Sequence, residues 1–125
     1  MRTITVVELE TNQACSSQVA LFKRLFGESV EITEQLCLDH HVEFNWHWTA
    51  QHFLTAPALT EFSRITAPAW AEYTRIEDQA WSEFSRITDQ AITDQARAEY
   101  VRITAPAWAE YARIGAQAFA RAYLT

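Results

Sequence analysis

The stretch APAWAEYTRIE at residues 67–77 returns almost unchanged as APAWAEYARIG at residues 105–115. Both are copies of an eleven-residue unit that begins at residue 56 and continues to the end of the chain. The repetition is interrupted once, by the five residues DQAIT at 89–93. A repeat of this kind specifies an architecture and carries little information about chemistry, because each copy is a structural unit that packs on its neighbours. The other copies are APALTEFSRIT (56–66), DQAWSEFSRIT (78–88), DQARAEYVRIT (94–104) and the divergent AQAFARAYLT (116–125).

The apolar residues of each unit follow the spacing of one helix face. When the unit is numbered from 1 to 11, alanine holds position 3, and outside the last copy phenylalanine or tyrosine holds position 7 and isoleucine position 10. Steps of four, three and four residues keep these side chains on one side of an α-helix. A strand is excluded, because its two-residue period would change faces between consecutive copies. We therefore predict an all-α fold in which the helical core is lined by Phe62, Ile65, Tyr73, Ile76, Phe84, Ile87, Tyr100, Ile103, Tyr111 and Ile114.

Four interruptions are predicted within the helical region. Thr-Ala-Pro occurs at 55–57, 66–68 and 104–106. Proline inside a helix removes a hydrogen bond and collides with the preceding turn, whereas it is tolerated in the first turn after a threonine N-cap. Each Thr-Ala-Pro is therefore predicted to end one helix and to begin another. The insert rotates the apolar face by about 140°, so we also expect a turn or kink near residues 88–94.

The first fifty-five residues have a different composition and no repeat. Residues 3–9 are rich in β-branched side chains and favour a short strand, although Thr5 could equally cap a helical turn. Residues 13–26 form an amphipathic pattern that ends at Gly27, a residue type typical of helix C-termini. These features predict short N-terminal helices and at most one short strand.

The rest of this half extends the same pattern. Residues 30–40 favour helix over strand, and Asn45 is a suitable N-cap for a short aromatic helix over residues 46–54. A repeat unit has a single apolar face and cannot close a core alone. We therefore expect residues 1–55 to cover the repeats of residues 56–125 and to form one compact domain with them.

Large side chains at position 4 of the unit lie at the edge of the predicted apolar face, and three copies have tryptophan there. Such a tryptophan either packs against a second helix or contacts a partner, since tryptophan and tyrosine are enriched at the centres of interfaces. An alternative aromatic patch lies on the short helix, next to an acidic residue. The predicted partner-binding residues are Trp70, Trp81 and Trp108, with Trp46, Trp48 and Glu43 as the alternative patch.

Charge restricts the classes of partner. The net charge is −6, which argues against DNA, RNA or an anionic membrane as a direct ligand and is compatible with a basic protein surface. Glutamate at position 6 and arginine at position 9 are neighbours on a helix and are predicted to form ion pairs on a solvated outer face. These pairs are Glu61/Arg64, Glu72/Arg75, Glu83/Arg86, Glu99/Arg102 and Glu110/Arg113.

Few residues suggest chemistry. Cys15 and Cys37 are expected to be free thiols, since two isolated cysteines without a secretion signal rarely form a disulfide. The only weak metal candidates are grouped around Cys37, and their spacing matches no standard zinc site. With two glycines and no catalytic motif, we predict no enzyme activity and no cofactor. The metal candidates are Cys37, His40, His41 and His47.

No apolar run approaches the roughly 20 residues that cross a bilayer, and no signal peptide opens the sequence. We therefore expect no membrane partner and a location in the cytoplasm.

Several short stretches, together with the repeated Ala-Pro-Ala-Trp-Ala-Glu-Tyr-x-Arg-Ile, give the chain a resemblance to small uncharacterised proteins encoded by phages and bacteria. That group has no agreed activity, so the resemblance carries over no site residue. It implies a mobile-element protein that acts inside a bacterial cell. The stretches are Ala14-Cys15, Gln18-Val19-Ala20-Leu21-Phe22 and Phe26-Gly27.

These observations predict a non-enzymatic protein that binds another protein through its helix faces. In a phage setting the sharper prediction is an inhibitor of a host defence complex, such as an anti-CRISPR protein, which would occupy the basic surface of a nucleic-acid-handling complex. One alternative is a structural protein that self-assembles into homo-oligomers through its tryptophans. The other is a small metal or ligand binder that uses the cysteine and histidine residues.

Overall fold

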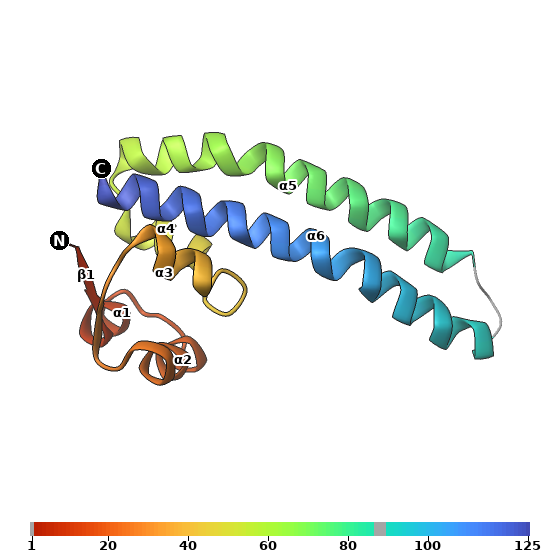
Figure 1. The fold of residues 1–125 in the computed structure, drawn as a ribbon, viewed down its shortest axis with the longest axis horizontal. Coiled ribbons are helices and arrows are strands. Elements are labelled where there is room, and N and C mark those ends of the chain that lie inside the picture. Colours follow the sequence, from red (N-terminus) through yellow and green to blue (C-terminus); the bar gives the residue numbers. More distant parts are fainter. Residues whose placement is uncertain (1, 87–89) are drawn as a thin grey trace.

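Helices account for most of the computed structural model, which describes residues 2–86 and 90–125 (Figure 1). The predicted all-α class is confirmed, and the described residues add one small two-stranded sheet where a single strand was expected. The elements in chain order are β1 (Thr3–Thr5), α1 (Val6–Thr11), α2 (Ser16–Phe26), β2 (Ser29–Glu31), α3 (Glu34–Asp39), α4 (Trp46–Phe53), α5 (Ala56–Ser85) and α6 (Gln90–Leu124).

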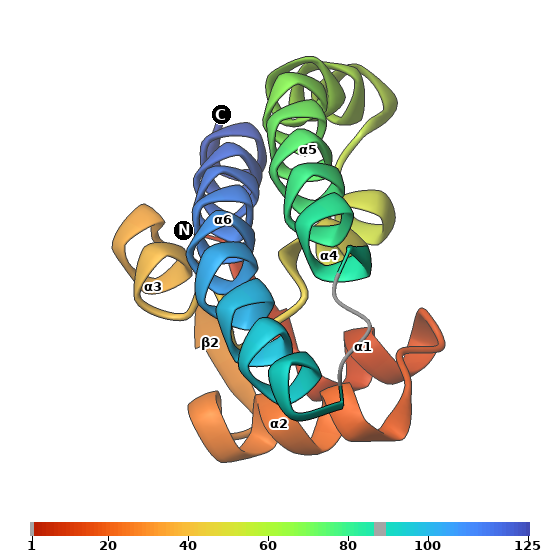
Figure 2. The same ribbon diagram turned by 90° about the vertical axis from the view of Figure 1, so that its right-hand side faces the viewer.

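The long helices α5 and α6 form an antiparallel hairpin and lie side by side in both views (Figures 1 and 2). Their aromatic residues show how the repeats are paired. The ring centroids of Trp70 and Tyr111 are 5.1 Å apart, and those of Tyr73 and Trp108 are 5.2 Å apart. Position 4 of one copy therefore contacts position 7 of the opposite copy in both directions, so these two copies are related by an approximate two-fold axis.

The five-residue insert lies close to the turn of this hairpin. Helix α5 ends at Ser85 and α6 begins at Gln90, so the chain does change helix near the insert. Residues 90–94 of the expected range are already helical, which corrects most of that range, and residues 87–89 lie outside the described residues. The aromatic pairing continues next to the turn, where the ring centroids of Trp81 and Tyr100 are 6.1 Å apart. Copies on either side of the insert are thus paired in the same register as the copies farther from the turn.

Two of the three predicted proline breaks are wrong. Helix α5 starts at Ala56 with Thr55 as its N-cap, as expected, but it continues through Pro68, and α6 likewise continues through Pro106. A proline inside a helix costs about 3 kcal/mol. Both internal prolines are exposed, so water can reach the backbone on that side. Thr66 and Thr104 are buried just before them, and aromatic rings contact each other across the hairpin just after them. Packing between the two helices therefore outweighs the local cost.

The buried seam of the hairpin follows the predicted face at positions 3 and 7 but departs from it at position 10 in two copies. Ile65 and Ile103, at position 10, are each 36% exposed, whereas Thr66 and Thr104, at position 11, are buried. The hydroxyl of Thr66 donates a hydrogen bond of 3.0 Å to the carbonyl oxygen of Phe62, which removes most of the cost of burying it. Threonine is smaller than isoleucine, and the distance between packed helices depends on the size of the side chains at the contact.

The predicted core list is accordingly only partly right. Phe62 is buried, and most of the other residues are half-buried at the sides of the seam. Ile65 and Ile103 are corrected to exposed positions, and Ile87 lies outside the described residues. The half-buried residues are Tyr73, Ile76, Phe84, Tyr100, Tyr111 and Ile114.

A helix cap at Thr5 sets the boundary between the first strand and the first helix. Strand β1 pairs antiparallel with β2, with Ile4 opposite Val30. Thr5 ends the strand and also starts α1, because its hydroxyl accepts a hydrogen bond from the Glu8 backbone amide at 3.1 Å while the Glu8 carboxylate accepts one from the Thr5 amide. The two interpretations of Thr5 are therefore both correct. Helix α2 ends as predicted at Gly27, whose φ of 80° favours glycine.

Of the two remaining N-terminal predictions, one is partly wrong and the other is confirmed. Residues 30–40 were expected to be helical, but β2 occupies their first residues and α3 begins only at Glu34. Asn45 caps α4 as predicted, since its side-chain oxygen accepts a hydrogen bond of 3.0 Å from the Trp48 amide.

The principal core lies where this N-terminal layer meets the last repeat. Figures 1 and 2 show the layer packed against one end of the hairpin, and α3 and α4 both contact α6. The residues of the divergent copy face it, so Ala116, Ala118, Phe119 and Ala120 are all buried. The last copy has therefore diverged where it packs against a second layer, whereas the other copies pack mainly against each other.

We predict different effects from enlarging two alanines that hold the same repeat position on the same helix. Ala116 is buried and Ala105 is exposed, and both occupy position 1 of their copies. Ala116→Leu should lower the free energy of unfolding by about 1–3 kcal/mol, because it overpacks a closed core. Ala105→Leu should change it by less than about 0.5 kcal/mol. Urea denaturation measures both, and equal losses would show that the N-terminal layer does not cover the last repeat.

Candidate functional site: an aromatic pocket at the layer junction

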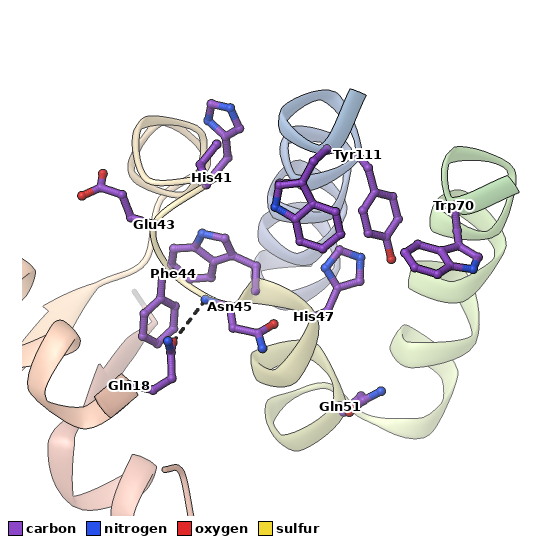
Figure 3. A pocket seen from close by; sticks show the side chains of 13 residues that line it. Gln18, His41, Glu43, Phe44, Asn45, His47, Gln51, Trp70 and Tyr111 are labelled. Atoms are coloured by element: carbon purple, nitrogen blue, oxygen red, sulfur yellow. Dashed lines mark hydrogen bonds between the residues drawn. The ribbon is translucent and has the colours of Figure 1, made fainter. Parts of the chain in front are cut away.

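A pocket of about 470 Å³ opens where α4, α5 and α6 meet the loop that follows α3 (Figure 3). This volume falls in the range of small-ligand sites, roughly 300–1,000 Å³. The N-terminal half and the hairpin both contribute to its wall, so the pocket exists only because the two layers are packed together. Its aromatic side chains are Phe44, Trp46, Trp70, Trp108 and Tyr111, and its polar ones include Gln18, His41, Glu43, Asn45, His47 and Gln51.

His47 of α4 joins the two layers at this pocket. Its ring stacks on Tyr111 with centroids 4.6 Å apart and meets Phe62 edge-on at 5.3 Å. A Cβ atom placed on Gly115 would collide with the imidazole Cε1 and lie 2.9 Å from Nε2. His47 therefore fits against α6 only because residue 115 is glycine.

The environment of His47 favours its neutral form. Burial lowers the pKa of the imidazole, because the charged form loses hydration that no partner replaces. The Nε2 atom is buried and has no hydrogen-bond partner among the described residues. His47 thus packs between helices as a ring whose neutral form is favoured.

The tryptophans at position 4 are exposed to a degree that fits their predicted place at the edge of the apolar face. Trp70 is 47% and Trp108 43% exposed, and both line the pocket. Each contacts a tyrosine of the opposite helix and leaves the rest of its indole in contact with solvent. Trp81 is 57% exposed but lies farther along the hairpin and does not line the pocket. The three predicted anchors therefore divide into a pair at the pocket and one remote tryptophan.

The residues of the alternative aromatic patch, Trp46, Trp48 and Glu43, do not share one exposed surface. Trp46 is only 2% exposed, stacks on Phe119 with centroids 5.5 Å apart, and donates its indole N–H to the carbonyl oxygen of His40 at 3.0 Å. The prediction that Trp46 serves as an exposed anchor is therefore wrong, and its role is to pack α4 on α6. Trp48 is half-buried against the core and does not line the pocket, whereas Glu43 does.

The weak metal candidates are not brought together. Cys37 is buried, and burial, with a smaller contribution from the charge of Glu34, raises the pKa of its thiol to about 12. His41 Nδ1 lies 2.7 Å from the Leu38 carbonyl oxygen and His40 Nδ1 lies 3.0 Å from a Glu43 carboxylate oxygen. Within residues 2–86 and 90–125, no group of three or more histidine, cysteine or acidic side chains is placed to hold a metal ion.

Other predictions from the sequence concern the outer surface. Both cysteines are free thiols, as expected. The glutamate–arginine pairs three residues apart are formed and exposed, so they mark a solvated face and not a site. None of the helices among the described residues has the length and apolarity needed to cross a membrane.

Comparison of the chain with known protein families, curated proteins and solved structures finds no match.

The sequence predicts three residues of this pocket, Trp70, Trp108 and Glu43, as partner-binding residues, but it does not show that they lie together. It also gives His47 only as a weak metal candidate and Tyr111 only as a core residue, although one signal points to their contact. Position 11 is threonine in three copies but glycine at residue 115, in a copy that otherwise closely matches residues 67–77. Loss of a side chain at one buried position of a repeat indicates that another group occupies its space.

We predict that His47 decides whether Gly115→Ala raises or lowers the free energy of unfolding. Glycine to alanine within a helix normally stabilises by up to about 1 kcal/mol. Gly115→Ala should instead lower the free energy of unfolding by about 1–3 kcal/mol, because the new methyl group collides with an imidazole held between two rings. In a His47→Ala background the same change should stabilise the protein. Chemical denaturation of the four proteins measures this double-mutant cycle, and a stabilising Gly115→Ala in the parent would exclude the contact.

Proposed function

We propose that the protein is a non-enzymatic interaction protein that binds a partner protein through the surface around the aromatic pocket. The observation that supports this most strongly is that Trp70 and Trp108 stay nearly half exposed beside a concave site. Aromatic anchors of this kind supply much of the affinity of protein interfaces. The ring of Tyr111 lies between the two indoles and packs against both, which limits their freedom before binding and so reduces the entropy lost on association.

A narrower proposal concerns the setting of this interaction. We propose a phage-encoded inhibitor of a host defence complex, of the anti-CRISPR kind, that acts in the bacterial cytoplasm on a nucleic-acid-handling complex. Its support is the net charge of −6, which would be attracted to a basic groove, together with the resemblance to phage and bacterial proteins. The pocket itself does not depend on this narrower proposal.

A second function is favoured by a different surface. Beyond the N-terminal layer the hairpin continues as two helices alone (Figure 1), and there Trp81 is 57% exposed and Val101 55% exposed. A two-helix hairpin has no second layer to cover such side chains, and a second copy of the chain could supply one. Self-association through the distal hairpin is therefore the alternative proposal.

We predict that three equivalent tryptophans separate these proposals. Trp70→Ala and Trp108→Ala should each lower the affinity for the recovered partner at least about thirtyfold. This factor corresponds to the loss of an aromatic anchor that contributes about 2 kcal/mol to binding. Trp81→Ala, the matched control at the same repeat position, should bind the partner like the parent. The partner is recovered from bacterial lysate with the tagged parent, and its affinity for each folded variant is measured by calorimetry.

Light scattering on the same variants completes the test. A monomeric parent with partner binding sensitive to Trp70 supports the interaction proposal. A parent oligomer that dissociates only in Trp81→Ala supports self-assembly. Equal partner affinities in all three variants would contradict a role for the pocket surface.

A further inference from the structure

The exposed faces of the pocket are electron-rich. Indole and phenol rings carry negative charge on their faces, and a cation within about 6 Å of such a ring is attracted to it. Trp70, Trp108 and Tyr111 form a connected group, since the Tyr111 centroid lies 5.1 Å from Trp70 and 5.5 Å from Trp108. Figure 3 shows Trp70 and Tyr111 from two different helices directed toward each other above His47. A ligand in this pocket would therefore contact several ring faces at once.

The charges of the pocket agree with the rings. Glu43 is its one carboxylate, and among its thirteen described lining residues none is lysine or arginine. One oxygen of Glu43 lies 3.0 Å from His40 Nδ1, and the side chain remains 48% exposed, so the carboxylate is accessible to a ligand. Burial lowers the pKa of the His47 imidazole and so disfavours a positive charge on this ring.

We infer that the pocket binds a cationic side chain of the partner, specifically the guanidinium group of an arginine, an inference that rests on the proposed function and names the chemistry it recognises. A guanidinium is planar and stacks on aromatic rings while its N–H groups donate in the ring plane. The half-exposed Trp70 and Trp108 supply the stacking surfaces. Glu43 lines the pocket on the loop after α3, and Figure 3 shows its carboxylate directed away from Trp70 and Tyr111, so it adds negative charge at the rim without contacting the stacked guanidinium. A lysine ammonium is more strongly hydrated and cannot stack, so it fits less well.

Other ligand classes fit these residues less well. An anion would meet Glu43 and no lysine or arginine of the lining, so its charge would be opposed. A wholly apolar group would cover Glu43 and the amide side chains of Gln18 and Gln51 without replacing their hydrogen bonds to water. An arginine fits better, because its methylene groups and guanidinium face contact the rings while its N–H groups stay hydrogen-bonded to water at the open side of the pocket.

The test is a nuclear magnetic resonance titration of the full chain with acetyl-Gly-Arg-Gly-amide. The matched probes are the peptides in which citrulline or lysine replaces arginine, since citrulline keeps the shape and removes the charge. We expect saturable shifts of the Trp70 and Trp108 indole N–H resonances with the arginine peptide, weaker binding of the lysine peptide and no saturation with citrulline. Trp70→Leu should weaken binding by about twofold to thirtyfold. Glu43→Gln removes a solvent-screened charge at the rim and should weaken binding by a smaller factor, up to about fivefold. Trp81→Leu should leave it unchanged.

The inference is overturned if the arginine peptide produces no saturable shift, if citrulline binds as tightly, or if Trp81→Leu weakens binding as much as Trp70→Leu. Glu43→Gln keeps the shape of a half-exposed side chain, so it reports on charge even if a tryptophan variant fails to fold. The proposed function is judged separately by partner recovery. A partner whose affinity depends on Trp70, with no binding of the arginine peptide, would overturn the cationic ligand and leave the interaction surface standing.

Discussion

The in-register antiparallel pairing of the repeats is the constraint on which the other features of this structure depend. Position 4 of each central copy contacts position 7 of the opposite copy, and small residues of the seam let the two backbones approach. This register brings Trp70 to Tyr111, and it places Gly115 beside His47 of α4. A shift by one residue would turn a different set of side chains toward α4 and would remove the wall of the pocket.

Equivalent residues of the repeat are buried to different extents, depending on whether the N-terminal layer covers them. At position 4, Phe119 is fully buried under α4, Trp70 and Trp108 are partly covered at the pocket, and Trp81 is exposed beyond it. The layer covers only one end of the hairpin (Figure 1), so burial decreases along an otherwise uniform helix face. The pocket forms at the boundary, where one wall comes from each layer. Its specific chemistry therefore arises from the contact between a repeat and a non-repeated segment.

Local features of the fold could be predicted from the sequence, and features that depend on contacts between distant residues could not. The caps at Thr5, Gly27, Asn45 and Thr55 act within a few residues, so their chemistry is visible in the sequence. Pro68 and Pro106 have the local signature of a helix start, yet they lie inside helices that are held by packing across the hairpin. The seam was misplaced at position 10 because isoleucine is more apolar than threonine, while the contact between packed helices also depends on side-chain size. The pocket joins α4 to residues of α5 and α6 that are distant in the sequence, and the glycine at 115 is the one sign of the contact between α4 and α6.

The register is tested most directly by nuclear Overhauser measurements between aromatic rings of α5 and α6. Assigned spectra should show cross-peaks from Trp108 to Tyr73 and from Trp70 to Tyr111, because these rings lie 5.2 Å and 5.1 Å apart between centroids. Trp81 to Tyr100 should give a weaker peak at 6.1 Å. Cross-peaks from Trp108 to Phe84 or to Phe62 in their place would reveal a pairing shifted by one whole copy. Such a result would contradict the register and the pocket built on it.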